Sequence, residues 1–282
     1  MEIIRTAAEL AACIRLTRHT GQKIGFVPTM GALHEGHKSL VERSKNICDV
    51  TVVSIFVNPT QFAPSEDLEK YPRPIEADIQ LLESVGTDIL YLPSVEEIYP
   101  TGCSTFVNVE GITELFEGQI RPTHFRGVAT VVTILFNMVQ PDTAFFGQKD
   151  LQQCAVIKKM VGDLYVPVEI EICPTVREAD GLAMSSRNRY LSEGERAEAL
   201  TLIKTLRSVE SDIRAGLSVA DAKLKGSKYF DSLRKKGVLE YLEIVSVETF
   251  RPLESFNGDE KVAVIIAAKL GTTRLIDNLL LD

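Results

Sequence analysis

Short apolar runs alternate with helical segments along the first part of the chain, and this alternation constrains the fold more than any other feature. The runs with the composition of buried strands are residues 23–28, 50–57, 88–92, 143–146 and 168–173. The segments with a helical pattern are residues 36–48, 74–85, 127–139 and 150–161. A further helix is expected to begin at Thr6, because Thr6-Ala-Ala-Glu9 has the spacing of a capping box. Strands that alternate with helices predict an α/β fold with a doubly wound parallel sheet.

The loops that follow the strands are the expected binding regions. In doubly wound sheets, ligands bind beyond the carboxyl ends of the strands, near the point where the strand order reverses. The loops at these ends are residues 29–31, 58–61, 147–150 and 175–178. We therefore expect the functional residues in or next to these four segments.

The pattern changes after about residue 175. Two charged amphipathic helices are expected over residues 192–215 and 219–236, followed by strands over residues 239–247 and 261–270. Helices followed by strands indicate a separate α+β unit. We predict one domain over residues 1–175 and a second, smaller C-terminal α+β domain over residues 176–282.

Composition argues against several classes of partner. The chain has 31 Lys and Arg against 39 Asp and Glu, a net charge of -8 without a basic run, so a nucleic-acid partner is not expected. The longest apolar run, residues 262–268, is too short to cross a bilayer, so no membrane partner is expected either. The five cysteines are scattered and never spaced Cys-x-x-Cys, which favours a reducing, cytoplasmic location without disulfides or a structural metal site.

The first candidate motif is His34-Glu-Gly-His37, which follows a strand and opens a helix. The N-terminus of a helix offers unpaired N–H groups and a partial positive charge, which suit phosphate. A zinc site of the His-Glu-x-x-His type requires four-residue spacing, whereas these histidines are three apart. A P-loop requires Lys directly after its second Gly, whereas His37 intervenes before Lys38. A polyphosphate site is favoured over both, and over a pair of surface histidines without function.

Three further groups have suitable chemistry for binding. Lys149 and Asp150 lie where a strand gives way to a helix, where an ammonium can neutralise phosphate and a carboxylate can accept from ribose hydroxyls; an exposed ion pair is the alternative. The segment Met184-Ser-Ser-Arg187 combines two hydroxyls with a guanidinium and suits a triphosphate; a polar turn before a helix is the alternative. Gln61 and Gln153 are neutral donors and acceptors that suit a small hydroxy acid, although either one alone reads as a surface residue.

The motif and its surroundings resemble a known family. His-x-Gly-His after a first strand is similar to the adenylate-forming signature of the class I synthetase and nucleotidyltransferase superfamily. The longer Pro28-Thr-Met-Gly-Ala-Leu-His-Glu-Gly-His37 resembles the pantothenate synthetase family more narrowly. Four later segments match the same family in the same order: residues 57–62, 121–128, 145–153 and 174–188. The resemblance covers essentially the whole chain and is weakest after residue 192.

The resemblance implies a fold, a reaction and a set of partners. Family members have a Rossmann-like domain and a smaller C-terminal domain that closes over the ATP site, and they form homodimers. They are AMP-forming acid–amine ligases that condense pantoate with β-alanine. ATP and pantoate first give pantoyl-adenylate and pyrophosphate, and the amine of β-alanine then releases AMP. Mg²⁺ is expected with ATP, without a dedicated protein metal site.

The resemblance also assigns residues. His37 is implied as a proton donor, and His34, Lys149 and Arg187 as catalytic groups around the α-phosphate and the departing pyrophosphate. Gln61 and Gln153 are implied to hold pantoate, with Gln61 also near β-alanine, and Asn58, Arg121 and Tyr71 as outer contributors. The implied ATP-binding residues are Met30, Gly31, Ala32, Leu33, His34, Glu35, Gly36, His37, Gly147, Gln148, Lys149, Asp150, Val176, Met184, Ser185, Ser186 and Arg187.

Two rival functions follow from the same motifs. A nucleotidyltransferase of the same superfamily, acting on another small substrate, would use the same His-x-Gly-His helix. A nucleotide-binding regulatory protein would bind ATP without turnover. Only a ligase forms AMP in a reaction that depends on both an acid and an amine.

Overall fold

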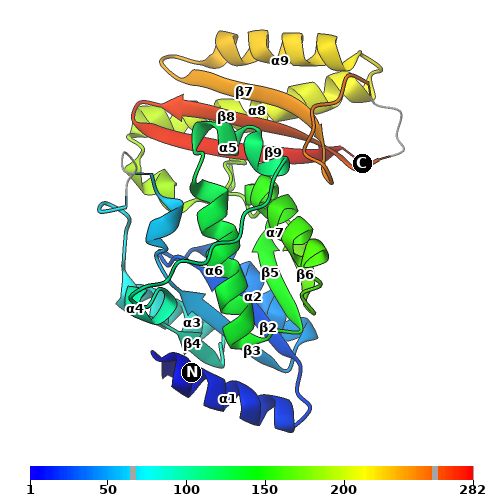
Figure 1. The fold of residues 1–282 in the computed structure, drawn as a ribbon. Coiled ribbons are helices and arrows are strands. Elements are labelled where there is room, and N and C mark those ends of the chain that lie inside the picture. The colour runs from blue at the N-terminus through cyan, green and yellow to red at the C-terminus, as the bar shows by residue number, and fades with distance from the viewer. Residues whose placement is uncertain (64–67, 256–259, 282) are drawn as a thin grey trace. The chain divides into compact units, whose positions relative to one another are not determined.

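The computed structural model describes residues 1–63, 68–255 and 260–281 (Figure 1). The chain divides into two compact units. The first consists of Met1–Gly147 and Val156–Pro174, and the second of Gln148–Ala155 and Thr175–Asp282. Each unit has its own sheet, so each is described by itself.

The first unit is built on a six-stranded sheet with the order β1-β4-β3-β2-β5-β6. All of its strand pairs are parallel. The strands are β1 (Glu2–Ile4), β2 (Ile24–Thr29), β3 (Val50–Ile55), β4 (Ile89–Tyr91), β5 (Thr143–Gly147) and β6 (Glu169–Cys173). The predicted α/β class with a doubly wound parallel sheet is confirmed.

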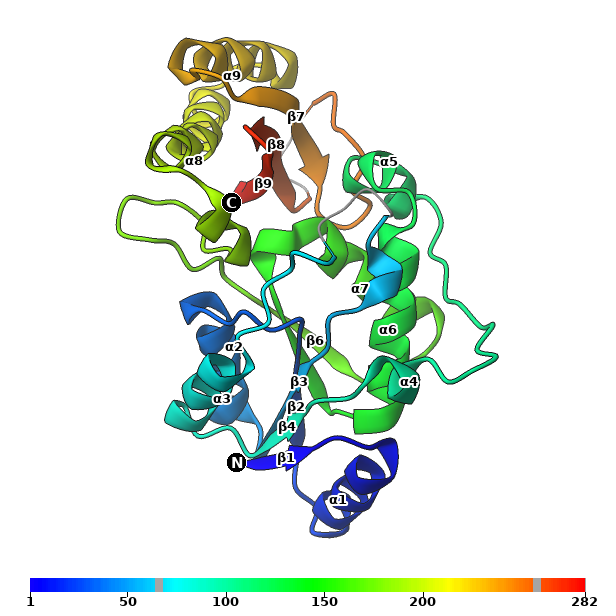
Figure 2. The ribbon, with the colours of Figure 1, turned by 90° about the vertical axis from the view of Figure 1, so that its left-hand side faces the viewer.

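Helices cover both faces of this sheet. Those of the first unit are α1 (Ala7–His19), α2 (Glu35–Ile47), α3 (Ile75–Ser84), α4 (Val95–Ile98), α5 (Glu117–Ile120) and α6 (His124–Val139), with 3-10 turns η1 (Pro59–Gln61) and η2 (Ile112–Glu114). Helices α2 and α3 lie on one face of the sheet, and α1 and α6 on the other (Figure 2). Helix α7 (Leu151–Asp163) begins in the second unit and ends in the first.

Close contact between α2 and the sheet depends on Gly25 in β2. A Cβ atom at this position would lie 2.1 Å from the hydroxyl of Ser44 on α2. That hydroxyl lies 2.8 Å from the hydroxyl of Thr51 in β3, so a buried polar pair forms where the helix meets the sheet. Absence of a side chain at Gly25 therefore sets how near the helix that starts at His34 can approach.

The strand order reverses between β2 and β5. From β2 the chain proceeds outward through β3 and β4, and then returns to place β5 on the other side of β2. Because the strands are parallel, the carboxyl ends of β2 and β5 lie at the same edge of the sheet. This edge is the switch point at which ligands of doubly wound folds bind.

The second unit contains a three-stranded antiparallel sheet in the order β7-β8-β9. Its strands are β7 (Val238–Ser246), β8 (Val262–Leu270) and β9 (Thr273–Leu281). Its helices are α8 (Glu193–Arg214) and α9 (Val219–Leu233), with 3-10 turns η3 (Gln148–Asp150) and η4 (Ser186–Tyr190). Both helices pack on the sheet around a core that includes Leu202, Phe230 and Val264.

Several boundaries differ from those predicted. Strands β1 and β9 were not predicted, and α6 begins at His124 rather than at residue 127. The capping box at Thr6 is confirmed, because the Thr6 hydroxyl accepts from the Glu9 N–H and the Glu9 carboxylate accepts from the Thr6 N–H. Among the described helices, none has the length and apolar character needed to span a membrane.

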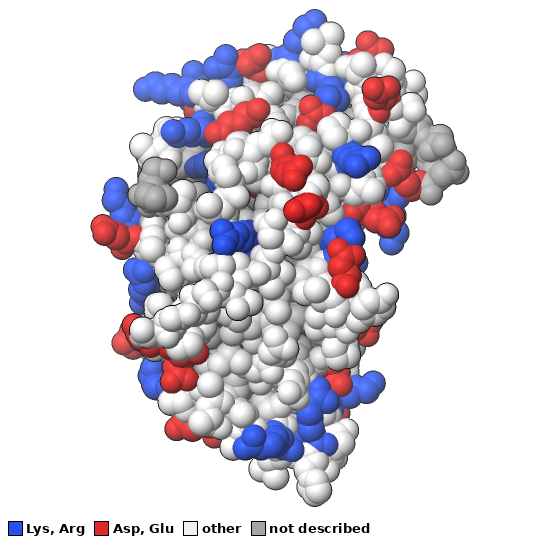
Figure 3. All heavy atoms as spheres, viewed as in Figure 1, with Lys and Arg blue, Asp and Glu red and all other residues white. Residues whose placement is uncertain are grey.

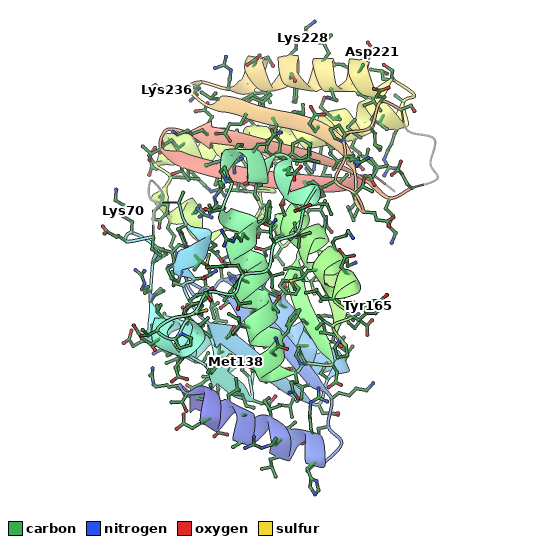
Figure 4. All side chains as sticks on the ribbon, in the orientation of Figure 1. Lys70, Met138, Tyr165, Asp221, Lys228 and Lys236 are labelled. Carbon is green, nitrogen blue, oxygen red and sulfur yellow. The ribbon has the colours of Figure 1, made fainter. Side chains whose placement is uncertain are left out.

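Charged side chains of both signs are interspersed on the face seen in Figure 3. Lys228 on α9 is exposed and projects away from its helix (Figure 4). Mixed charge of this kind is ordinary for a protein surface that faces water.

Candidate active site

The loop after β2 is held in an unusual backbone conformation by a buried carboxylate. Gly31 and Ala32 both have positive φ angles, 81° and 52°. The Asp78 carboxylate on α3 accepts hydrogen bonds from the N–H groups of Ala32 and Leu33, each at 2.8 Å. Asp78 is 2% exposed. These two hydrogen bonds thus compensate the strain at Ala32 and fix the path of the chain into α2.

His34 and His37 cap the start of α2 reciprocally. His34 is the N-cap residue, and its Nδ1 accepts from the Gly36 N–H at 3.1 Å. The Nδ1 of His37 accepts from the His34 N–H at 3.3 Å, and the two ring centroids lie 4.2 Å apart. An imidazole nitrogen accepts a hydrogen bond only when it carries no proton. With each Nδ1 used as an acceptor, Nε2 is the nitrogen of each ring that is left to donate.

Asn58 and Gln61 form a buried polar cluster after β3. Asn58 is 1% and Gln61 7% exposed. The Asn58 amide donates to the Gln61 side-chain oxygen and to the Gly127 carbonyl, both at 3.1 Å. The Gln61 amide nitrogen lies 2.8 Å from the sulfur of Met30. The structure therefore brings together Gln61 and Met30, which are 31 residues apart.

Tyr99 completes this cluster from outside the predicted segments. Its hydroxyl donates to the Asn58 side-chain oxygen at 2.9 Å. Burial raises the pKa of Tyr99, so the phenol keeps its proton and remains a donor. The tyrosine thereby fixes the orientation of the Asn58 amide, which in turn orients Gln61.

Helix α6 begins beside η1. The backbone carbonyl of Gln61 accepts from the Arg121 guanidinium at 3.3 Å and lies 3.0 Å from Nδ1 of His124. A Cβ atom at Gly127 would lie 2.5 Å from the carbonyl oxygen of Thr60. Gly127 therefore lets the first turn of α6 lie directly against the backbone of η1. Arg121 and His124 act on the backbone of Gln61, whereas Asn58 acts on its side chain.

In the second unit, Lys149 and Asp150 form η3. The Lys149 ammonium lies 3.5 Å from the Asp150 carboxylate, with the Lys149 side chain 19% exposed and that of Asp150 49%. The backbone of this turn is held by Asn278 on β9. The Asn278 amide donates to the carbonyls of Gln148 and Lys149, each at 3.0 Å, and its oxygen accepts from the Gln148 side chain at 3.1 Å.

The segment from Thr175 to Asn188 folds back on itself in the second unit. Arg177 and Ala183 form an antiparallel bridge, and the Met184 N–H donates to the Val176 carbonyl at 3.0 Å. Ser185 caps η4, since its hydroxyl accepts from the Arg187 N–H at 3.2 Å. These contacts hold Val176 and Met184–Arg187 in one compact segment.

Acidic groups anchor the same segment to α8. Arg196 donates to Glu178 at 2.6 Å and to Asp180 at 2.9 Å. Burial opposes ionisation of Asp180, but hydrogen bonds from the Leu182 N–H and from Arg196 outweigh it and lower the pKa of Asp180. The Asn188 amide donates to Glu178 and to the Ala183 carbonyl.

The predicted site residues fall into two groups. In the first unit are Met30, Gly31, Ala32, Leu33, His34, Glu35, Gly36, His37, Gln61 and Gly147. In the second unit are Gln148, Lys149, Asp150, Gln153, Val176, Met184, Ser185, Ser186 and Arg187. Of the residues proposed for pantoate, Gln61 is buried, whereas Gln153 on the first turn of α7 is half-buried.

The sequence interpretation missed four residues that shape these groups: Asp78, Tyr99, Asp277 and Asn278. Asp78 and Tyr99 lie in ordinary amphipathic surroundings that give no local signal. Asp277-Asn278, in contrast, is a polar pair inside an otherwise apolar run, and that interruption is a usable signal.

Comparison with known proteins identifies the family to which the chain belongs. The family model described as pantoate-beta-alanine ligase matches residues 2–280. A pantothenate synthetase from Acetivibrio thermocellus is 52% identical over 284 residues, which cover 100% of both chains. A crystal structure of the enzyme from Thermus thermophilus superposes with a TM-score of 0.94 at 47% identity, covering 99% of each chain.

A third relative has been solved as a complex with ligands. The pantoate-beta-alanine ligase from Francisella tularensis, complexed with beta-gamma ATP and beta-alanine, has a TM-score of 0.81 at 36% identity. The match covers 99% of this chain and 97% of that one. Given the family match over nearly all residues and these identities, the chain belongs to the pantoate–β-alanine ligase family.

Proposed function

We propose that the chain condenses pantoate with β-alanine in two steps at the expense of ATP. In the first step a pantoate carboxylate oxygen attacks the α-phosphorus, and the bond to the bridging oxygen of the pyrophosphate breaks. In the second step the amine of β-alanine attacks the acyl carbon of the adenylate, AMP leaves and the amine loses a proton. The products are pantothenate, AMP and pyrophosphate.

The start of α2 supports the first step. A carboxylate is ionised at neutral pH, so this step requires in-line positioning and stabilisation of phosphate charge rather than a strong base. The helix N-terminus contributes its partial positive charge, and the acceptor role of Nδ1 in His34 and His37 leaves Nε2 of each ring to donate. We assign His37 as the donor toward the leaving phosphates, with His34 beside it and residues 30–37 lining the nucleotide.

The second unit contributes the cationic groups. Lys149 is mostly buried and held by a fixed backbone turn, and Arg187 follows the capped start of η4. We assign both to the triphosphate, together with Gly147, Gln148, Asp150, Val176, Met184, Ser185 and Ser186. Closure of the smaller domain, residues 176–282, over the nucleotide would exclude the water that hydrolyses an acyl-adenylate.

Gln61 is the group we assign to pantoate and to the approaching β-alanine, with Gln153 as a second pantoate contact. The Gln61 side chain is oriented by Asn58 and lies beside Met30 of the nucleotide loop. An amide fixed in this way suits the hydroxyls and carboxylate of a small hydroxy acid. Because Gln61 is assigned to pantoate and Met30 to the nucleotide, their contact supports a pantoate carboxylate that lies near the α-phosphate of ATP.

We propose that Mg²⁺ enters with ATP as part of the substrate. This ion is usually bound through phosphates and waters with one or two carboxylates, rather than by a protein cage. Among the described residues, no group of three or more His, Cys, Asp or Glu side chains is arranged to hold a metal ion. When bound, Mg²⁺ supplies charge neutralisation at the β- and γ-phosphates.

We also propose that the protein acts as a homodimer in the cytoplasm, where ATP is available and thiols stay reduced. The resemblance to dimeric family members supports the assembly. Sedimentation equilibrium tests it directly, with a mass of twice 31.2 kDa expected at micromolar concentration. A monomer mass at all concentrations would contradict the proposal.

The reciprocal capping of α2 by two histidines at the switch point is the observation that carries the proposed function. Its test is isotope exchange. With pantoate, ATP and Mg²⁺ but without β-alanine, labelled pyrophosphate should exchange into ATP, and AMP should accumulate only when β-alanine is added. Exchange that strictly requires β-alanine would exclude the two-step scheme, and exchange without pantoate would favour a different substrate, as in a nucleotidyltransferase.

A further inference from the structure

Asn278 on β9 uses every polar group of its side chain to hydrogen-bond the turn η3, which carries Lys149. Both amide hydrogens are used, one on the Gln148 carbonyl and one on the Lys149 carbonyl, and the amide oxygen accepts from Gln148. Asn278 is 2% exposed and is paired with Ile265 in the middle of the β8–β9 ladder. The turn that carries Lys149 is therefore hydrogen-bonded to a buried position in the middle of β9.

Its neighbour Asp277 holds a different segment. The Asp277 carboxylate accepts two hydrogen bonds from Arg177, at 2.7 and 2.9 Å. Arg177 also donates to the Gly181 carbonyl and to the Asn278 carbonyl, both at 3.1 Å. Since Arg177 bridges to Ala183, this network fixes the segment that leads into Met184–Arg187.

The two residues are joined to each other as well. The Asn278 N–H donates to the Asp277 carboxylate at 2.8 Å, and Asp277 is 4% exposed. A buried ion pair of this kind is often no better for stability than apolar residues of the same size. Apolar residues in β9 would keep the strand, but they would hold neither segment in a defined geometry.

We propose that Asp277 and Asn278 are positioning residues for the adenylation step, and this rests on the proposed function. Neither is among the residues that we assign to a substrate. Asn278 fixes the backbone from which the Lys149 ammonium reaches phosphate, and Asp277 acts through Arg177 on the segment that carries Arg187. Two cationic groups from separate parts of the sequence are thus set relative to each other by one dipeptide.

The first test is Asn278→Asp, which keeps the size of the side chain and replaces the donor by an acceptor. We expect kcat for pantoate-dependent pyrophosphate exchange to fall about tenfold to a hundredfold, since small displacements of a catalytic group have effects of this size. The KM for pantoate should stay within about twofold, because no pantoate contact is touched.

A double-mutant cycle separates positioning from general damage. In the Lys149→Ala background, Asn278→Asp should change the exchange rate less than about twofold, because the group it positions is gone. An equal fold-change in both backgrounds would overturn the proposal, as would wild-type kcat in the single variant. Wild-type protein without any pantoate-dependent exchange would instead contradict the proposed function.

Leu275→Val is the matched control. Leu275 lies in the same strand and is 6% exposed in the core of the second unit, without contact to η3 among the described interactions. It should lower Tm and leave kcat unchanged. Suppose that Leu275→Val and Asn278→Asp lower Tm by the same amount and also lower kcat by the same factor. Any destabilisation of β9 would then be enough to reduce kcat, and the proposed positioning role of Asn278 would be overturned.

Arg177→Lys gives an independent measurement should Asn278→Asp not fold. Lysine keeps the charge, but its single nitrogen has three N–H donors and cannot reproduce the four hydrogen bonds that Arg177 makes from two nitrogens. We expect kcat to fall about tenfold, with the effect absent in the Arg187→Ala background. A wild-type kcat in a folded Arg177→Lys protein would contradict the role of Asp277.

Discussion

At His34 one ring nitrogen has a structural task, and we assign a chemical task to the other. Its Nδ1 caps α2, while its Nε2–H is the donor that we assign to phosphate. Asparagine is among the best N-cap residues and offers an acceptor of similar reach, but it lacks the second ring nitrogen. A substitution at His34 can therefore remove the donor assigned to phosphate and keep the acceptor that caps α2.

We predict that His34→Asn retains the stability of the wild type and loses activity, whereas His34→Ala loses both. Removal of the cap should lower the free energy of unfolding by about 0.5–2 kcal/mol in His34→Ala. Loss of the preorganised donor should lower kcat on the order of a hundredfold in both variants. Urea unfolding and steady-state kinetics on the same samples measure the two effects, and an active His34→Asn would show that His34 is structural only.

Gln61→Ala is predicted to weaken pantoate specifically. One lost hydrogen-bonding partner corresponds to an increase in KM for pantoate of about tenfold, while ATP binding changes little. The β-alanine step should also slow, because the amine approaches the same acyl carbon. Gln22→Ala is a suitable control, since Gln22 is exposed and precedes the amino end of β2, at the opposite edge of the sheet.

Titration calorimetry measures the pantoate affinity directly. Normal binding by Gln61→Ala would remove this residue from the pocket and leave Gln153 and Arg121 as the groups to examine. Structural damage is recognised separately. Gln61→Ala removes a hydrogen-bonding partner of Asn58, and damage from this loss should lower Tm without changing the ratio of the KM for pantoate to the KM for ATP.

At the scale of elements, helix α8 stabilises the turn between α9 and β7 through one carboxylate. Glu198 accepts from the N–H groups of Lys235, Lys236 and Gly237, at 2.6, 2.8 and 2.7 Å. Burial alone would raise its pKa, but these three hydrogen bonds outweigh it and hold the pKa of Glu198 below the ordinary 4.5. The ionised form therefore stabilises the folded state.

A carboxyl group with a lowered pKa stabilises the fold above its unfolded value, and that stability is lost as pH falls through the folded value. We predict that Glu198→Gln is less stable than wild type at neutral pH by about 1–3 kcal/mol, the usual range for hydrogen bonds to a charged group. The difference should shrink below pH 4.5. Urea unfolding over a pH series measures it, with the exposed Glu193→Gln as control.

A difference between wild type and Glu198→Gln that stays constant into acid would show that the charge of Glu198 contributes nothing. Loss of the same magnitude in Glu193→Gln would indicate a general effect of charge at the start of α8 instead.

The long elements were predictable because their signals are local. β3 is β-branched and buried on both faces, and the capping box at Thr6 is complete within four residues. β1 has three residues, too few for any period to be seen. β9 was missed because Asp277-Asn278 interrupts its apolar pattern, and the partners that make this pair tolerable are 100 and 130 residues away.

Local sequence signals also determine which parts of the candidate site could be placed together in advance. His34 and His37 lie in one short motif, so their proximity follows from helical spacing. Asp78 supports the loop before them from 46 residues away, and nothing near Asp78 indicates that its carboxylate is buried. The role of Asp78 depends on contacts between residues far apart in the chain, and these contacts cannot be inferred from the pattern of a single sequence.

At the scale of the whole molecule, the candidate residues are divided between two compact units. If His37 and Arg187 act on one ATP molecule as we propose, both units would have to bind it. We predict that saturating ATP and pantoate slow amide hydrogen exchange in residues 175–188, while exchange in β7 changes little. Mass spectrometry of peptic fragments resolves the two regions, and unchanged exchange in residues 175–188 would exclude an ordering lid.

The hydrogen bonds from Asn278 to the Lys149 turn also set when this turn can be completed during synthesis of the chain. Asn278 leaves the ribosome 129 residues after Lys149. N-terminal parts of a chain generally fold first as it emerges. The parallel sheet and the capped start of α2 can thus form on a nascent chain whose Lys149 turn still lacks its anchor. The Lys149 turn therefore gains its Asn278 hydrogen bonds only once nearly the whole chain has been synthesised.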